Sequence, residues 1–520
     1  MYWRLVDMAM LTPEQGFLLL GAFWLFMLLA TQIFAKRKED SREEFLAAKR
    51  HIPWWMGGAS VAASWTWAGA LLVSTQMSYE KGLAGLFWFL VPNIIALGIF
   101  FFLGPRIREM FAHGFTLPQY ISHRLGSPLV HKLYLIPFFF GQVIAVAFNV
   151  FAASTLISVL TGISVAVLMP ILVLIPLSYT LLSGVRSSIV TDFMQMVILL
   201  AGVIVVIPLA VAAVGGFGPI EAGFGGTSHT SGMFDPEVAF AFGIVTSIGL
   251  ISQTLSDQQY WQRVFAIKKE DVPKAFLFGA FLFAVVPLGL SLLGFMAANP
   301  ATGVSLPAGT DPSMIGILTV SSLVPAAITM VFVVMLMAGL CSPADSGISA
   351  AASLWVTDVI PYSSEEKRVM ALQDGEKKLS EQDEAVMQKL ERRAVLQTRV
   401  GMVVLSVVAL AVAYLSYAIA GFGVKQLFLL SISIAACISV PTVLSLYWEG
   451  LKAKGVFIGS GIAIAIGMPA FIYFNWANNA PMIVASSVFM LVASAAGCLL
   501  TPSLERLWNG GKGFINKSKW

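Results

Sequence analysis

Thirteen apolar stretches, most of them about 20 residues long, constrain this chain more than any other feature of its sequence. A helix needs about 20 consecutive apolar residues to cross a bilayer. Together with a hydrophobic content of 58%, the stretches predict an all-α polytopic membrane protein with about 13 transmembrane helices. They run over residues 14–36, 54–80, 83–104, 129–161, 164–183, 188–214, 237–262, 275–298, 320–357, 398–420, 425–447, 454–474 and 480–502.

Lysine and arginine residues are divided unevenly between the two sets of loops that these spans define. On one side of the membrane lie 29 of the 32 basic residues. Basic loops remain in the cytoplasm, so we expect a bacterial inner (cell) membrane protein with its N-terminus outside and its C-terminus cytoplasmic. The longest cytoplasmic segment, 361–399, is densely charged and is expected to form a solvated helical insert.

Motifs of soluble and metal-dependent enzymes do not occur in the chain. It contains no His-Glu-x-x-His, Gly-x-Ser-x-Gly or Walker pattern, and its five histidines lie outside the predicted spans. The three cysteines fall inside apolar stretches with no metal-binding or disulfide spacing. We therefore expect a protein that is not an enzyme, whose partners are the lipid bilayer and a small solute rather than nucleic acid.

The stretch 54–79, WWMGGASVAASWTWAGALLVSTQMSY, is unusual for a membrane-spanning helix. Its middle is rich in glycine, alanine and hydroxyl residues, with Trp65 and Trp67 among them. Small residues let helices approach closely, and a helix that unwinds there exposes carbonyl groups that can hold a cation. The alternative is a tightly packed helix with no ligand.

Polar residues inside the predicted spans are candidates for function, because burying them in lipid is costly. Asp192 has the alternative role of a carboxylate at a helix N-terminus, and Asp257 that of an ion-pair partner for Arg263 near the interface. Asp345 has no obvious local cation. The neutral candidates either bond neighbouring helices or line a polar cavity; they are Asn93, Gln142, Asn149, Gln253 and Thr254.

Four short segments resemble motifs of the sodium:solute symporter family, in the same order along the chain. EEFLAAKRHIPWWMGGASVAAS (43–64) resembles its F-x-x-A-x-R-x-x-P-x-W entry into core helix 1. TLPQYISHRLG (116–126) resembles T-x-P-E-Y-x-x-x-R-F-G, with Gln119 replacing the glutamate. IVTDFMQ (189–195) resembles W-T-D-x-x-Q, and QQYWQRVFA (258–266) resembles the Q-R end of core helix 6. A Ser-rich segment that resembles core helix 8 completes the set. Residues 64–74 and 79–89 are most similar to the urea-transporter branch of the family.

This resemblance implies a LeuT-like inverted repeat of five plus five helices, with core helices 1 and 6 broken at the midplane. Residues 54–214 would form the first repeat, and 237–447 the second, interrupted by the cytoplasmic insert 359–397. Residues 1–53 would supply a peripheral transmembrane helix and a cytoplasmic loop. Residues 448–520 would supply two peripheral transmembrane helices and a cytoplasmic tail.

The resemblance also implies a sodium site between core helices 1 and 8. Its carbonyl ligands match Ala63, Thr66 and Gly339, and its first hydroxyl ligand matches Ser342. The second hydroxyl position is Pro343, which has no oxygen to offer in its side chain. Ser346 lies one turn beyond Ser342 on the same helix face and offers a replacement.

A second cation site of some family members matches Asp192 and Ser346, with Asp345 in place of a hydroxyl. Carboxylates there suit direct sodium binding and proton uptake equally, so the coupling ion is expected to be Na+, with H+ as the alternative. We expect Asp345 to form part of the coupling site.

The substrate pocket implied by the resemblance contains aromatic and amide side chains but no arginine or lysine, which an anionic solute would require. A neutral or zwitterionic solute, or a cation held by tryptophan faces, fits it better. The predicted function is a symporter that couples a sodium gradient to uptake of a urea-like or amino-acid-like solute. A proton-coupled urea or amine transporter and an uncoupled channel-like facilitator are the alternatives. The predicted pocket residues are Trp65, Trp67, Ala70, Phe89, Asn93, Gln142, Asn149, Gln253 and Thr254, with Ser431, Ser433 and Ser439 on core helix 10.

Overall fold

A computed structural model describes residues 11–35, 41–307, 310–374, 380–419 and 424–510. Within these ranges the chain is helical or irregular, and its only β-type pairing is one isolated bridge between Ile52 and Ile267. The predicted locations of the two termini concern residues that lie outside these ranges.

The helices follow one another along the chain with short connections. The longer α-helices are α2 (Pro13–Ala30), α4 (Trp54–Trp65), α5 (Ser74–Gly98), α6 (Phe100–Met110), α8 (Pro128–Thr161), α9 (Val165–Ala213), α12 (Ile244–Ser256), α13 (Gln258–Ala266), α14 (Val272–Ala298), α16 (Ala326–Leu354), α18 (Glu381–Ala418), α19 (Val424–Ser433), α20 (Ala436–Tyr447), α21 (Ala453–Ile462), α22 (Met468–Trp476) and α23 (Ala480–Gly510). The shorter ones are α3 (Arg42–Ala47), α7 (Leu117–Leu125), α10 (Gly218–Glu221), α11 (Pro236–Val238), α15 (Ile315–Leu323) and α17 (Ser364–Asp374). Segments of π-helix are η1 (Thr31–Ala35), η3 (Gly69–Val73), η4 (Ala239–Gly243), η8 (Trp355–Val359) and η9 (Ala463–Gly467), and 3-10 turns are η2 (Ala48–Arg50), η5 (Lys269–Asp271), η6 (Pro300–Thr302) and η7 (Pro312–Met314).

Twelve helical stretches among the described residues are long and apolar enough to cross a membrane. One of them, Gly69–Met110, contains the predicted span 83–104 and the second half of the predicted span 54–80, which are separated where the chain reverses direction at Gly82, whose φ is +55°. A Cβ atom on Gly85 would lie only 2.1 Å from the carbonyl oxygen of Met77, which a continuous helix would not allow. The twelve-residue α4 then forms the first half of the predicted span 54–80.

Two helices are interrupted, as the sequence predicted for core helices 1 and 6. Helix α4 ends at Thr66, whose φ of −86° and ψ of 67° are not helical, and α12 ends at Asp257, which is extended. Polar backbone groups at membrane depth must find partners within the protein. Beyond α4, the side-chain oxygen of Asn149 on α8 accepts a 3.0 Å hydrogen bond from the Ala68 N–H, which satisfies part of the irregular backbone.

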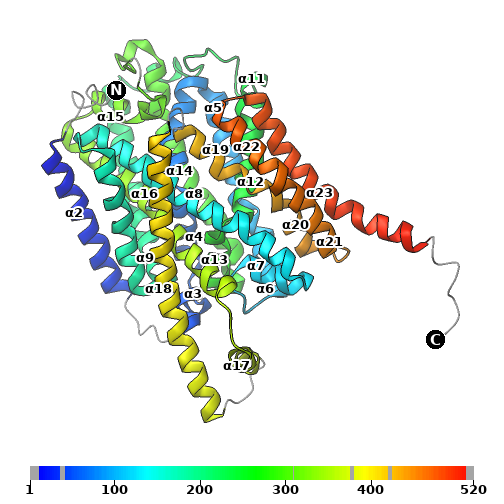
Figure 1. Cartoon of the computed structure of the whole chain (residues 1–520). Helices are drawn as coiled ribbons and strands as arrows, with labels where there is room; N and C mark the ends of the chain where they lie inside the picture. Colours follow the sequence, from blue (N-terminus) through cyan, green and yellow to red (C-terminus); the bar gives the residue numbers. More distant parts are fainter. Residues whose placement is uncertain (1–10, 36–40, 308–309, 375–379, 420–423, 511–520) are drawn as a thin grey trace, which may run out of the picture.

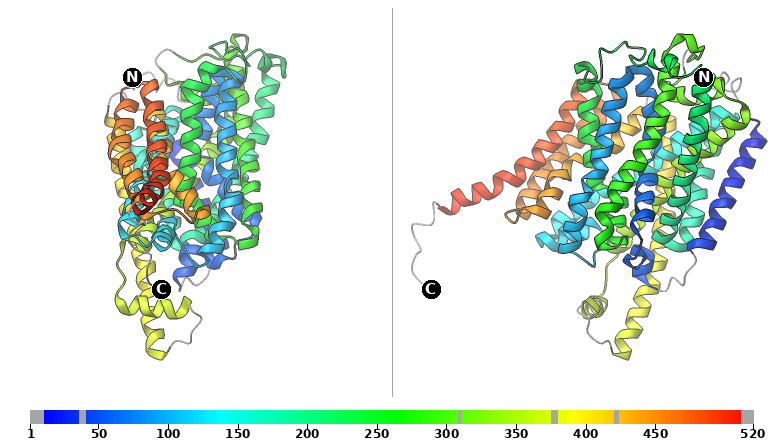
Figure 2. Two further views of the ribbon diagram at one scale, coloured as in Figure 1. Left: turned by 90° about the vertical axis from the view of Figure 1, so that its right-hand side faces the viewer. Right: turned by 180° about the vertical axis from the view of Figure 1, so that it is seen from behind.

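The outermost helices lie at opposite edges of the bundle, with α2 on one side and α21–α23 on the other (Figures 1 and 2). At one end, α17 and the first part of α18 extend beyond the other helices (Figure 1). These two segments contain the predicted charged insert, and ion pairs from Arg368 to Asp383 and from Arg393 to Glu366 join them. The described part of the insert is therefore mainly helical, and α18 continues without interruption into a stretch that is apolar enough to cross a membrane.

Candidate functional site

A fully buried ion pair links α13 to α9 beside the interruption in α4. The Arg263 guanidinium donates a 2.8 Å hydrogen bond from Nη2 to Oδ2 of Asp192, and both side chains have no exposed surface. The guanidinium also donates to the hydroxyl oxygens of Ser60, Ser188 and Ser346, at 3.1, 3.1 and 2.5 Å. Ion pairs at such depth require many hydrogen bonds to offset desolvation, and Arg263 has them.

Asp192 accepts hydrogen bonds from hydroxyl groups on two further helices, α4 and α16. Ser60 on α4 donates to it at 2.5 Å, and Ser342 on α16 donates to its other oxygen at 2.5 Å. Ser64 and Ser346, one turn further along the same two helices, lie 3.3 Å from it. The carboxylate therefore ties α4, α9 and α16 together at one point.

Asp345 is the second carboxylate of this site and is also fully buried. Its oxygens accept hydrogen bonds from Tyr179 at 2.7 Å, Ser188 at 2.8 Å, Ser346 at 3.2 Å and Thr191 at 3.3 Å. Among the described residues, no basic side chain lies within 4.0 Å of it. We call Asp192, Asp345, Arg263, Ser188 and Ser346 the charge cluster; it contains two carboxylates and one guanidinium.

The residues predicted for the sodium site lie next to this cluster. Ser342 bonds Asp192 directly. A Cβ atom on Gly339 would lie 3.2 Å from the Thr66 carbonyl oxygen, so α16 approaches the interrupted end of α4 closely there. The Ala63 carbonyl accepts the Thr66 N–H at 3.0 Å. The interrupted end of α4, Gly339 and Ser342 therefore lie close together in the structure. These are the groups that the family resemblance combined in one predicted sodium site.

Several expectations about charge at membrane depth are wrong. Arg263 is fully buried inside the protein, although the sequence placed it in a basic segment on the cytoplasmic side. It pairs with Asp192 on a distant helix, and Asp257 instead accepts a hydrogen bond from Gln142 at 2.8 Å. Asp192 is not at a helix N-terminus either, because it lies eight residues beyond the interruption at Gly184.

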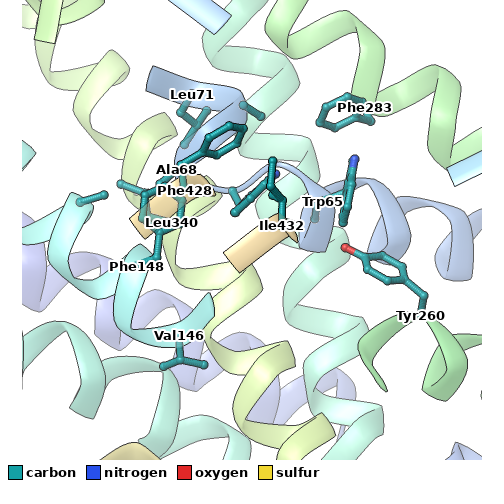
Figure 3. Close-up of a cluster of buried hydrophobic side chains, with 14 of the residues drawn as sticks. Trp65, Ala68, Leu71, Val146, Phe148, Tyr260, Phe283, Leu340, Phe428 and Ile432 are labelled. Carbon is teal, nitrogen blue, oxygen red and sulfur yellow. The ribbon is translucent and has the colours of Figure 1, made fainter. Parts of the chain in front are cut away.

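Aromatic rings surround the interruption in α4 (Figure 3). The ring of Trp65 lies edge-on to Tyr260 at 5.2 Å, and Trp67 packs against Phe148 at 5.3 Å and Phe428 at 5.4 Å. Both indole N–H groups are buried, and neither has a hydrogen-bond partner in the described part of the chain. Buried N–H groups usually have a hydrogen-bond partner, so a polar solute that reached the two indoles would accept their hydrogen bonds.

Two cavities follow each other along α19. The first, of about 170 Å³, is lined by Gln76, Glu80 and Phe428 among others. The second has a free volume of about 10 Å³, enough for one water molecule. Its polar lining comes from α8, from the end of α12 and from α19: Gln142, Gln253, Ser256, Asp257 and Ser431. We call it the polar cavity; its lining contains one carboxylate, that of Asp257.

Seven other predicted pocket residues are buried without lining the polar cavity: Ala70, Phe89, Asn93, Asn149, Thr254, Ser433 and Ser439. Three of them donate to carbonyl groups of their own helices: Asn93 to Phe89 at 2.7 Å, Thr254 to Ile251 at 2.9 Å and Ser439 to Ala436 at 3.3 Å. Among the described residues, the Ser433 hydroxyl has no hydrogen-bond partner.

Six residues that contact the two carboxylates were not identified as site residues from the sequence: Ser60, Ser64, Tyr179, Ser188, Thr191 and Arg263. A usable signal was present, because three helices each carry an i, i+4 polar pair, and such pairs share one helix face. These pairs are Ser60 with Ser64, Ser188 with Asp192, and Ser342 with Ser346. Arg263 was marked by its family motif, whose Q-R end it forms with Gln262, but it lies close to the basic segment that follows α13.

Comparisons with known proteins agree with this architecture. The model of the sodium:solute symporter family matches residues 45–463. A urea-proton symporter of rice (Oryza sativa subsp. japonica) is 22% identical over 97% of this chain and 73% of its own length. A probable urea active transporter of Schizosaccharomyces pombe is 25% identical over 53% of this chain, and that match spans 44% of the fission yeast protein.

A solved structure, the substrate-bound outward-open state of a Na+-coupled sialic acid symporter, superimposes with a TM-score of 0.74. It covers 94% of this chain and 98% of its own, at 16% identity. At this identity the likeness shows the fold alone. That fold is the LeuT-like inverted repeat that the sequence predicted, and the interruptions after α4 and α12 are those of core helices 1 and 6.

Proposed function

Because the chain belongs to the sodium:solute symporter family, whose members are transporters rather than enzymes, we propose that it couples inward movement of Na+ to uptake of a small neutral or zwitterionic solute. Urea-like and amino-acid-like solutes are the proposed classes, and the names of the rice and fission yeast relatives support the first. The proposal places the protein in a bacterial inner membrane, with repeats at 54–214 and 237–447.

One observation carries the proposal: the charge cluster contains two carboxylates and only one guanidinium. With both carboxylates ionised, the cluster has one uncompensated negative charge in a fully buried environment. Such a charge is expensive at membrane depth, and one monovalent cation removes the cost. Asp192 is bonded to Ser342, so a cation held by Ser342 and the Thr66 carbonyl lies beside this charge.

The proposed coupling between ion binding and solute binding depends on the positions of the ion ligands. The proposed ion ligands come from the interrupted end of α4 and from α16, so a bound ion joins two helices that must separate when the site opens. An ion that binds one conformation better shifts the population towards it, and the solute is favoured by the same shift. The ion and the solute therefore promote each other's binding.

Removing the Ser342 hydroxyl should weaken this ion site before it affects folding. We expect Ser342→Ala to lower the apparent sodium affinity of transport by about 10-fold, the effect of losing one hydrogen bond or ligand to a charged group. The sodium dependence of uptake measures it, with Ser321→Ala as the control because the Ser321 hydroxyl bonds only its own helix. An unchanged sodium dependence would count against the assignment.

Proton coupling is the second candidate, and the position of Asp345 favours it. This carboxylate is surrounded by four hydroxyl groups and has no ion pair among the described residues. A proton bound there would remove the excess charge of the cluster as effectively as a sodium ion. The rice relative is named a urea-proton symporter.

Reconstitution distinguishes these functions. Proteoliposomes containing the full chain are given radiolabelled urea with an inward sodium gradient, with an inward proton gradient, or with neither. Sodium symport predicts accumulation above equilibrium with the sodium gradient alone. Accumulation with the proton gradient alone would establish the second candidate, and equilibration without accumulation would show an uncoupled facilitator.

A further inference from the structure

Asp257 is a buried carboxylate that the charge cluster does not include. It is 5% exposed and lies at the interruption between α12 and α13, where it lines the polar cavity. No lysine, arginine or histidine side chain lies within 4.0 Å of its carboxylate among the described residues. Within contact distance, its charge is therefore compensated by hydrogen bonds and not by an ion pair.

Part of the role of Asp257 is structural. Its Oδ1 atom caps α13 by accepting the Gln259 N–H at 2.8 Å, and the same atom accepts from Gln142 at 2.8 Å. Its other oxygen, Oδ2, has only one long contact of 3.4 Å, from the Gln259 side chain. Capping and the Gln142 bond thus leave one carboxylate oxygen with unused capacity to accept hydrogen bonds.

The remaining polar groups around the cavity do not compensate this charge. The side-chain oxygen of Gln253, which is 6% exposed, has no hydrogen-bond partner. The Ser431 hydroxyl already donates to the Phe428 carbonyl at 2.8 Å. An amide can turn to present either its oxygen or its NH2 group, but an ionised carboxylate can only accept. Asp257 therefore decides which solute chemistry fits.

We propose that Asp257 binds the transported solute through a positively charged nitrogen, either an ammonium or a guanidinium-type group. The inference rests on the proposed function and selects, among its nitrogen-containing solutes, those with a cationic end. Binding brings a positive charge into contact with a buried carboxylate, in addition to the strong hydrogen bonds that an ionised carboxylate accepts from any donor. Neutral urea would donate similar hydrogen bonds without compensating the charge.

Guanidinium and urea provide a direct test, since they have nearly the same planar shape and differ in charge. Counterflow of radiolabelled guanidinium and of radiolabelled urea is measured in proteoliposomes with equal sodium inside and outside. No ion gradient is needed, so a failure of ion coupling does not affect this result. The wild-type protein should exchange guanidinium with a lower half-saturation concentration than urea.

Asp257→Asn keeps a side chain that caps helices well and removes only the charge. We expect it to raise the half-saturation concentration for guanidinium by about 10-fold or more, the typical effect of losing a charged hydrogen bond, and that for urea by less than about 3-fold. Asp257→Glu, which retains the charge, should recover most of the preference for guanidinium. Asp235→Asn is the matched control, because Asp235 caps α11 in the same way outside the membrane-spanning helices.

A purely structural role for Asp257 would lower the amount of folded protein or affect both solutes equally. An Asn variant with the wild-type preference for guanidinium would therefore overturn the inference. So would a wild-type protein that exchanges urea but not guanidinium, even if gradient-driven uptake of urea still supported symport.

Discussion

Replacing Arg263 with methionine should lower the free energy of unfolding by about 3–5 kcal/mol, the cost of leaving a buried charge without its partner. The guanidinium is fully buried and is the only basic group within 4.0 Å of Asp192 among the described residues. Its removal leaves two carboxylates near each other in a site with no water-exposed surface. Thermal unfolding of the purified full chain measures this loss of stability.

A second substitution tests whether the unpaired carboxylate of Asp192 causes this loss of stability. Asp192→Asn in the Arg263→Met background removes the unpaired charge. We expect the double variant to recover much of the lost stability, because the effects of substituting two groups in direct contact are not additive. Arg393→Met is the control, because Arg393 pairs with Glu366 while being 43% exposed, and an exposed pair is worth at most about 1 kcal/mol. An equal loss of stability in Arg263→Met and Arg393→Met would contradict the conclusion that the burial of Arg263 and Asp192 causes the large effect.

Replacing Asp345 with asparagine should have the largest effect on ion coupling. The charge cluster then contains one carboxylate and one guanidinium, so its excess negative charge disappears while the hydrogen-bonding side chain stays. We expect the apparent affinity for the coupling ion to fall by about 10- to 100-fold, within the usual range of coupling free energies. The ion dependence of uptake at a fixed solute concentration measures this fall.

The control for Asp345 is Asp311→Asn, at an exposed aspartate that caps a short turn. It should transport with unchanged ion dependence. Normal ion dependence in Asp345→Asn would remove this carboxylate from the coupling site and leave Ser342 and the α4 carbonyl groups as the remaining candidates.

Hydropathy and the family resemblance together were sufficient to predict the fold. Span positions follow from hydropathy, because lipid requires long apolar helices with internally satisfied backbone, and the small residues around Thr66 indicated where core helix 1 is interrupted. The contact of Asp192 with Ser342 was not predicted directly, because the family resemblance placed Asp192 with Ser346 in a second cation site and Ser342 in the first. This contact could not have followed from local spacing, since 150 residues separate the two side chains.

Arg263 shows why part of the site could not be predicted. It follows an apolar stretch and precedes Lys268 and Lys269, so its place in the sequence is typical of a cytoplasmic loop. The interruption at Asp257 starts a new helix, α13, which directs Arg263 towards α9 and α16. A local pair between Asp257 and Arg263 was therefore the wrong expectation, because the backbone direction changes between them.

The most direct test of cation coupling is the thermal unfolding midpoint of the detergent-purified full chain in NaCl, compared with equal concentrations of KCl and choline chloride. A ligand that binds only the folded state raises the midpoint by mass action. The account predicts a rise specific to sodium in the wild-type protein and a smaller one in Asp345→Asn. Identical midpoints in all three salts, up to high concentration, would contradict a sodium site at the charge cluster.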